Sequence, residues 1–156
     1  MKQIQPHQHT IDSIKYKHRL TGKVKSFEVD RQNIVHNAVY IYWLEESRIE
    51  YFRSIGISID SETFITKDRF VVAKNEVNYV SPAQFDQSYI LLTRVSEIHN
   101  SSIIFDQIIL SYPDNQLIVQ ATGVLVNLNP ITNAPERIHD DYRKLVIDYE
   151  DYAVLQ

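Results

Sequence analysis

The carboxylate of Asp30 stands shortly before a segment whose pattern predicts a helix that begins near Asn37. The first N–H groups of a helix have no partner inside the helix, and the helix macrodipole favours negative charge at that end. A carboxylate beside them can activate water while the N–H groups polarise a carbonyl oxygen. The same position also suits a carboxylate that only caps a turn. The stretch from Asp30 to Tyr40 is therefore a candidate hydrolytic site.

Glycine and cysteine usage excludes several other chemistries. The chain has three glycines and no cysteine. Gly22, Gly56 and Gly123 lie too far apart for a Walker loop, a dinucleotide-binding turn or a nucleophile elbow, because each needs glycines a few residues apart. The lack of cysteine excludes disulfides, thiolate metal sites and a cysteine nucleophile.

Histidine spacing gives no metal-binding pattern. Outside the N-terminal segment, the chain carries His18, His36, His99 and His139. None of these has the close spacing of a zinc motif such as His-Glu-x-x-His. His7 and His9 lie in a polar stretch, where a solvated tail is expected rather than a weak metal site. We expect no metal and no cofactor.

Length, charge and hydropathy set the general class of the protein. The chain of 156 residues, 44% of them hydrophobic, has the size of one globular domain. Its formal charge of -4 provides no basic field of the kind that nucleic-acid-binding proteins use. No run approaches the roughly 18 apolar residues of a membrane helix, and the N-terminus lacks the apolar core of a signal peptide. We expect a cytoplasmic protein without a membrane span or a nucleic-acid partner.

The segment after Asp30 predicts one long helix over about Ala38 to Ile55. It contains no proline or glycine, and Gly56 is well placed just past its C-terminus. Its larger side chains recur at three- and four-residue steps, as one face of a helix requires. This stripe consists of Tyr40, Trp43, Leu44, Ser47, Tyr51 and Ile55. Further apolar side chains lie off the stripe, so we expect the helix to contact protein around much of its girth.

Alternating polar and apolar residues predict strands on both sides of this helix. The first strand is expected over about Tyr16 to Val29. Turn-forming residues join the later strands, which favours antiparallel hairpins. These strands run over about Val71 to Tyr79, Ser88 to Ile98, Ser102 to Tyr112 and Gln116 to Leu128. The mixed segment from Pro135 to Tyr149 suits a short terminal helix.

This order of elements predicts an α+β fold in which an antiparallel β-sheet wraps around one long central α-helix. The sheet needs a cover for its apolar face, and the helix offers apolar surface on more than one side. The single domain is expected over residues 16–150. It follows a polar N-terminal lead-in of residues 1–15 and precedes a C-terminal tail of residues 151–156.

The residues from Asp30 to Tyr51 also form an ordered motif. An acid is followed by a turn residue, two branched apolar residues, an Asn, a Tyr and a run of Trp, hydrophobic, acid, acid, small and Arg. The motif reads Asp30, Asn33, Ile34-Val35, Asn37, Tyr40, Trp43-Leu44-Glu45-Glu46-Ser47-Arg48 and Tyr51. With residues 75–86 and 121–127, it resembles the hotdog-fold acyl-CoA thioesterases of the 4-hydroxybenzoyl-CoA thioesterase type. The resemblance covers roughly residues 17 to 148.

The resemblance implies an assembly and a mechanism. It implies dimers that join their sheets, an active site between subunits and, in many members, further assembly into tetramers. It implies that Asp30 is the essential acid, either as general base on water or as nucleophile on the thioester. Backbone N–H groups near Asn37 would then polarise the carbonyl. The substrate-binding residues expected with them are Asn33, Val35, His36, Tyr40 and Lys74.

Three residues of the region carry separate expectations. Asn33 departs from the family's usual glycine, at a position that often needs a left-handed backbone, which Asn tolerates better than most residues. Glu28 stands where a second aspartate is often found, and we expect it to face solvent. Glu46 is a second candidate catalytic carboxylate. The alternative for Glu46 is an ion pair with Arg48 or Arg53, or a contact with a partner chain.

The predicted function is hydrolysis of acyl-CoA or related acyl thioesters to free acid and thiol. Coenzyme A carries phosphates, so cations are expected at the mouth of the site. The candidates are Lys67, Arg69, Lys74, Arg94, Arg137 and Lys144. Two alternative functions stay open. One is a hotdog module that binds acyl-CoA or a partner protein without turnover, and the other is a thioesterase for acyl carrier protein.

Overall fold

The computed structural model describes residues 15–63, 69–151 and 154–155. Its elements are β1 (His18–Lys23), η2 (Ser26–Glu28), α1 (Asn37–Ser54), β2 (Arg69–Tyr79), β3 (Ser88–Ile98), β4 (Ser102–Tyr112), β5 (Leu117–Leu128), α3 (Asp140–Glu150) and β6 (Val154–Leu155). His7, His9 and Lys67 lie outside the described residues. The predicted order of a strand, a long helix and four further strands is confirmed.

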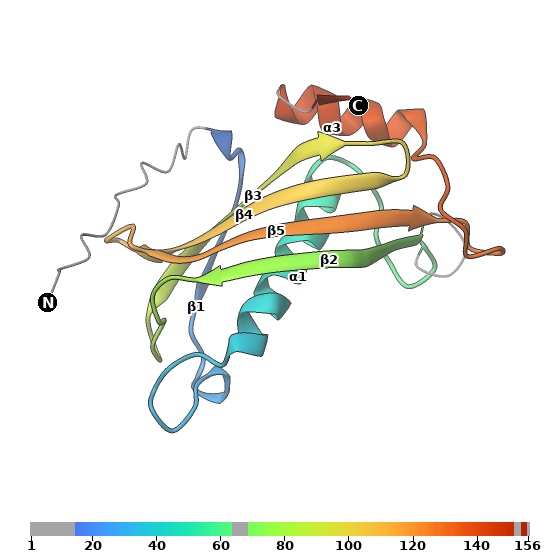
Figure 1. Ribbon diagram of the computed structural model, residues 1–156. Helices are drawn as coiled ribbons and strands as arrows, with labels where there is room; N and C mark the ends of the chain where they lie inside the picture. The colour runs from blue at the N-terminus through green and yellow to red at the C-terminus, as the bar shows by residue number, and fades with distance from the viewer. Residues whose placement is uncertain (1–14, 64–68, 152–153, 156) are drawn as a thin grey trace, which may run out of the picture.

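The described strands form one sheet in the order β1-β3-β4-β5-β2, with β6 beside β3. Neighbours along this path are antiparallel, whereas β6 runs parallel to β3. Val154 and Leu155, in the predicted C-terminal tail, thus pair with the sheet. The helix α1 crosses one face of the curved sheet, and α3 lies beside the end of β3 (Figure 1). The predicted antiparallel sheet around one long helix is confirmed.

The helix α1 begins and ends within one residue of its predicted limits. Every residue of the predicted stripe is buried, at 9% exposure or less. Phe52 and Arg48 join the same buried face, which the stripe did not include. Tyr51 packs against Phe105 of β4 and Tyr149 of α3, with ring centroids 5.5 Å apart in both pairs. The aromatic side chains of α1 therefore bind the sheet and α3 into one core.

The first strand is shorter than predicted, because β1 ends at Lys23 and not at Val29. The chain then turns into η2. The Glu28 N–H donates to the Lys25 carbonyl at 3.0 Å, and the Glu28 carboxylate accepts from the Lys25 N–H at 2.7 Å. Alternation of polar and apolar residues continues through this turn in the sequence, so the pattern alone did not reveal where the strand ends.

The strand β2 is the edge of the sheet next to β5, and within the described residues its outer edge has no neighbour. Its inner face lies against α1. The Phe70 ring stacks on Phe52 at a centroid distance of 5.4 Å, and the Tyr79 hydroxyl donates to the carbonyl of Asn37 at 3.2 Å. The two elements therefore meet near both ends of the seam between them, with the start of α1 beside the end of β2.

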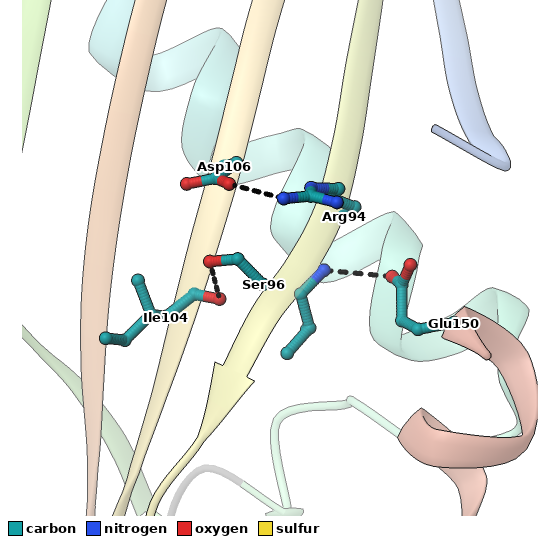
Figure 2. A network of polar contacts seen from close by, with 6 residues as sticks. Arg94, Ser96, Ile104, Asp106 and Glu150 are labelled. Atoms are coloured by element: carbon teal, nitrogen blue, oxygen red, sulfur yellow. Dashed lines mark hydrogen bonds and ion pairs between the residues drawn. The ribbon is translucent and has the colours of Figure 1, made fainter. Parts of the chain in front are cut away.

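The helix α3 is attached to the sheet through a buried carboxylate, that of Glu150, which is 1% exposed. The Glu150 carboxylate accepts a hydrogen bond from the Val95 N–H at 2.9 Å, and Figure 2 shows the Glu150 side chain turned towards β3. The pairing of β1 with β3 ends at His18 and Thr93, so no residue of β1 pairs with Val95 and Glu150 lies on that side of β3. Next to it, Arg94 and Asp106 form an ion pair at 3.0 Å across β3 and β4.

Candidate active site

The loop between η2 and α1 holds the Asp30 carboxylate in a fixed orientation. Asp30 Oδ1 accepts hydrogen bonds from the N–H groups of Gln32 at 2.8 Å and Ile34 at 3.2 Å. The Asp30 main chain also pairs with Ile34, N to O, at 2.9 Å. Oδ2 accepts no hydrogen bond from the described residues, and the side chain is partly exposed. One oxygen thus positions the carboxylate and the other is left for a ligand or water.

Asn33 has the left-handed backbone expected for it, with a φ of 61°. Its side chain adds a contact that a glycine cannot make. Asn33 Oδ1 accepts a hydrogen bond from the Phe85 N–H at 3.2 Å, and Val35 N–H donates to the Ala83 carbonyl at 3.0 Å. The Asp30 loop is therefore tied to the loop between β2 and β3 at two points.

The start of α1 presents free N–H groups. His36 is the N-cap residue, and its side chain makes no capping hydrogen bond. Val39 N–H donates to the His36 carbonyl at 2.9 Å, but the N–H groups of Asn37 and Ala38 have no acceptor among the described residues. Unpaired donors at a helix N-terminus attract a developing negative charge. They match the predicted site for a carbonyl oxygen.

A groove of about 310 Å³ opens at these N–H groups. Its walls come from the Asp30 loop, the start of α1 and the chain just after β2. The lining residues are Ile34, Val35, Asn37, Tyr40, Tyr79, Val80, Ser81 and Pro82. Asp30 does not line the groove of its own chain, although the loop that it orients supplies two of the lining residues, Ile34 and Val35. The hydroxyl of Tyr40 accepts the Ala83 N–H at 3.0 Å and so holds the floor in place.

Glu28 corrects one expectation, because it is buried at 8% exposure and does not face solvent. Its carboxylate accepts the indole N–H of Trp43 at 2.9 Å as well as the Lys25 N–H. Tyr89 stacks on Trp43 with ring centroids 4.2 Å apart. Burial and the negative charge of Glu28 raise the pKa of Tyr89 to about 12. Sequence reasoning missed this cluster, for which the only signal was an acid two residues before Asp30.

Other predicted site residues lie away from the groove. Glu46 is exposed on α1, nine residues after Asn37 and so about 13 Å further along the axis. Lys74 forms an ion pair with Glu76 at 2.9 Å and does not line the groove. His36 is exposed and also lies outside the groove lining. The structure thus brings Val35, Asn37 and Tyr40 together and leaves the other three apart.

Most cations proposed for coenzyme A have partners of their own. Four of them pair with carboxylates, namely Lys74, Arg94, Arg137 and Lys144. Arg69 donates to the side-chain oxygen of Asn133 at 2.7 Å. None of these five residues lines the groove at Asn37.

Within the described part of the chain, no cluster of three or more acidic or histidine side chains is suited to a metal ion. In the same ranges, no helix has the length and apolar character needed to cross a membrane.

Two thioesterases are similar to this chain in amino-acid sequence. The chain is 29% identical over 139 residues to a chloroplastic acyl-acyl carrier protein thioesterase of Arabidopsis thaliana, covering 88% of this chain and 72% of that protein. It is 26% identical over 111 residues to the acyl-CoA thioester hydrolase YbgC of Escherichia coli, covering 71% of this chain and 81% of that protein.

Solved structures share the fold. A thioesterase of Thermus thermophilus, complexed with coenzyme A and zinc, superposes with a TM-score of 0.76 at 25% identity, over 88% of this chain and 96% of that one. A 1,4-dihydroxy-2-naphthoyl-CoA thioesterase of Synechocystis superposes with a TM-score of 0.78 at 11% identity, over 84% of this chain and 96% of that one. The model of the Thioesterase-like superfamily matches residues 24–145. This chain, with its hotdog fold, belongs to the Thioesterase-like superfamily.

Proposed function

We propose that the protein hydrolyses acyl thioesters of coenzyme A or of acyl carrier protein to a free acid and a thiol. The observation that carries this proposal is the pair of N–H groups, on Asn37 and Ala38, that have no acceptor among the described residues, next to a groove that Asn37 lines. Family membership gives the reaction class, and the relatives named above act on both kinds of thioester.

Asp30 is the proposed catalytic group. Its Oδ2 is free to take a proton from water or to attack the thioester carbon, while the Gln32 and Ile34 N–H groups hold Oδ1. In the first route the carboxylate takes a water proton as the hydroxide oxygen bonds to the carbonyl carbon, and the thiolate leaves. In the second route the carboxylate oxygen bonds to that carbon to give a mixed anhydride, which water then hydrolyses. Both routes use the Asp30 carboxylate, beside the attacking water in the first and bonded to the carbonyl carbon in the second.

The start of α1 is the proposed oxyanion site. As the carbonyl oxygen gains negative charge, the Asn37 and Ala38 N–H groups meet it without reorganisation, because no acceptor in the described part of the chain occupies them. Loss of one donor of this kind typically raises the barrier by about 3 kcal/mol. Val35 and Tyr40 shape the groove for the group next to the carbonyl. Asn33 and His36 act, in this proposal, through the loop and the helix cap.

A second copy of the chain is the proposed partner in the site. Asp30 does not line the groove of its own chain, so its carboxylate can serve a groove on the other subunit. The unpaired edge of β2 supports this arrangement, because an exposed edge strand of 11 residues is a ready template for pairing. A homodimer, or a homotetramer built from two of them, is proposed on this basis. Glu46 and Lys74 would act only across such an interface.

A panel of thioesters tests the proposal. Purified protein is mixed with short, long and aromatic acyl-CoAs and with matching acyl carrier protein thioesters, and release of free thiol is followed. We expect turnover of at least one acyl class, with the ratio of kcat/KM between the two carriers identifying the physiological one. Absence of thiol release across the panel would contradict the function.

One observation favours a second candidate function, a module that binds acyl thioesters without turnover. Within a single chain the carboxylate of Asp30 and the groove at Asn37 are not one pocket. If they also stay separate in the assembly, the groove binds a thioester that no carboxylate reaches. Tight acyl-CoA binding without thiol release would establish this alternative.

A further inference from the structure

A second pocket lies between the C-terminal half of α1 and the first residues of β2. Its volume is about 90 Å³, which is room for the end of a chain and not for a whole ligand. Much of the wall is apolar and includes Phe52, Phe70 and Leu125. Two charged side chains, Glu45 and Arg48, complete it. Glu45 is exposed, whereas Arg48 is buried at 3% exposure.

The fold holds the Arg48 guanidinium in place with neutral groups. Nη1 donates to the side-chain oxygens of Asn75 at 3.0 Å and Gln107 at 3.4 Å. The Gln107 amide is oriented by its own N–H, which donates to the Leu44 carbonyl at 2.8 Å. A Cβ at Gly123 would lie 2.4 Å from Arg48 Nη1, so the lack of a side chain there leaves the space that the guanidinium fills.

The remaining donors of Arg48 have no partner among the residues that the structure describes. Nε and Nη2 make no hydrogen bond within the described residues, and no carboxylate of that part of the chain lies within ion-pair distance. Burial lowers the pKa of Arg48, and the charge of Glu45 opposes this effect from outside ion-pair distance. Burying a cation carries a desolvation penalty unless an anion pairs with the charge and hydrogen bonds satisfy its remaining donors. The unused donors, at the wall of an apolar pocket, are therefore suited to an anionic group of a ligand.

We propose that this pocket binds the carboxylate end of an aliphatic chain, with Arg48 as its partner. The planar guanidinium matches a carboxylate through two parallel hydrogen bonds. The apolar wall suits methylene groups and disfavours a strongly hydrated phosphate. Two sources share this chemistry: the distal carboxylate of a dicarboxylic acyl thioester, and a free fatty acid.

The first source rests on the proposed function. The pocket and the groove at Asn37 lie at opposite ends of the seam between α1 and β2. Arg48 follows Asn37 by eleven residues, about 16 Å along the helix axis at the standard rise. An acyl group whose thioester lies at Asn37 would therefore bring the far end of a long chain to Arg48.

A binding experiment tests the pocket independently of turnover. Calorimetry on the full chain compares decanoate with decanol, which has the same chain and no charge. We expect decanoate to bind at least about tenfold more tightly, because a charge-assisted bidentate pair forms only with the carboxylate. Arg48→Met should remove this preference and keep decanol binding. Arg19→Met, on β1 at the opposite edge of the sheet, should keep the preference.

A kinetic experiment separates the two sources. It compares tetradecanoyl-CoA with the coenzyme A monothioester of tetradecanedioic acid. A KM about tenfold lower for the diacid, lost in Arg48→Met, identifies the distal carboxylate as the ligand. If the two thioesters have equal KM values and decanoate still binds more tightly than decanol, the ligand of the pocket is a free fatty acid. Equal binding of decanoate and decanol by the unaltered protein overturns the proposal, even if Arg48→Met does not fold. Decanoate preference without hydrolysis of either thioester would contradict only the proposed function.

Discussion

The turn that carries Asp30 depends on Asn33, which replaces the glycine expected from the resemblance. Asn33 keeps a φ of 61° and adds a hydrogen bond to the Phe85 N–H. The left-handed conformation was foreseeable, because Asn is among the few residues that adopt it readily. The bond to Phe85 was not, because Asn33 and Phe85 are 52 positions apart and only the folded chain brings them together.

Asn33→Ala should destabilise the protein and reduce hydrolysis together. The left-handed backbone costs about 1 to 2 kcal/mol for a residue with an ordinary Cβ, and the bond to Phe85 is lost. Asn33→Gly should lose only the bond and show the smaller effect. Urea unfolding and kcat measure the two effects. Asn115→Ala, at another left-handed turn with a φ of 55°, should reduce stability without reducing kcat. Unchanged kcat in Asn33→Ala would show that the turn does not position Asp30.

Trp43→Phe should lower the free energy of unfolding, because Trp43 holds Glu28 at the start of the Asp30 loop. It removes the indole N–H from the buried Glu28 carboxylate, and hydrogen bonds to charged groups are worth about 1.5 to 3 kcal/mol. The loss should disappear in a Glu28→Ala background, which has no side-chain acceptor, if that bond is its cause. A double-mutant cycle on the free energy of unfolding measures this coupling. Additive effects of the two substitutions would exclude the bond as the source.

At the scale of elements, α1 was the most predictable part of the fold. Its stripe of large side chains has the period of a helix, and every member is buried as expected. Arg48 was considered only as one possible ion-pair partner of Glu46, and its burial was not foreseen. Sequence periodicity does not show that Gly123, on a distant strand, leaves a space for a guanidinium. The end of β1 was misplaced for a similar reason, since hydrogen bonds between Lys25 and Glu28 stop the strand.

The attachment of α3 predicts a pH-dependent stability. Burial raises the pKa of Glu150 above its ordinary value. The Glu150 carboxyl group therefore holds its proton more tightly in the folded protein than in the unfolded chain. The resulting stabilisation is fully present below the unfolded-state pKa of about 4.3 and is lost as the pH rises through the raised value. Glu150→Gln keeps an acceptor for the Val95 N–H and removes the buried charge.

Glu150→Gln should therefore be more stable than the unaltered protein at pH 7, and the difference should shrink towards pH 4. Thermal unfolding across this range measures it. Asp148→Asn, an exposed carboxylate of the same helix paired with Lys144, should show no comparable change with pH. A Glu150→Gln protein that is less stable at pH 7 would mean that the charged form of Glu150 is the favoured one.

At the scale of the whole molecule, family membership confirms the predicted class of enzyme and fold. The assembly stays a prediction, and it matters because the Asp30 carboxylate and the groove are apart within one chain. Sequence patterns place both features in the same motif, since Asp30 and Asn37 are close along the chain. Which groove the carboxylate serves depends on contacts between subunits, and a single sequence does not contain them.

Mixed oligomers should reveal a site shared between subunits. Asp30→Asn removes the carboxylate, and Val80→Trp fills the groove from a wall residue that is 57% exposed. If Asp30 serves the partner's groove, a dimer with one lesion on each chain has one intact site. Mixing the two inactive proteins should then restore about a quarter of the original activity, because half of the dimers are mixed. Mixing without recovery, or a monomer in sedimentation, would place the site within one chain.

The central claim is that the Asp30 carboxylate performs the chemical step. Asp30→Asn tests it directly, because the amide oxygen can still accept the Gln32 and Ile34 N–H groups and preserve the loop. Saturating acyl-CoA should give a kcat at least about 100-fold lower than that of the unaltered protein, with acyl-CoA affinity retained. Asp86→Asn, an exposed acid on the adjoining loop paired with Lys23, should keep its kcat. An Asp30→Asn protein with undiminished kcat would contradict the account.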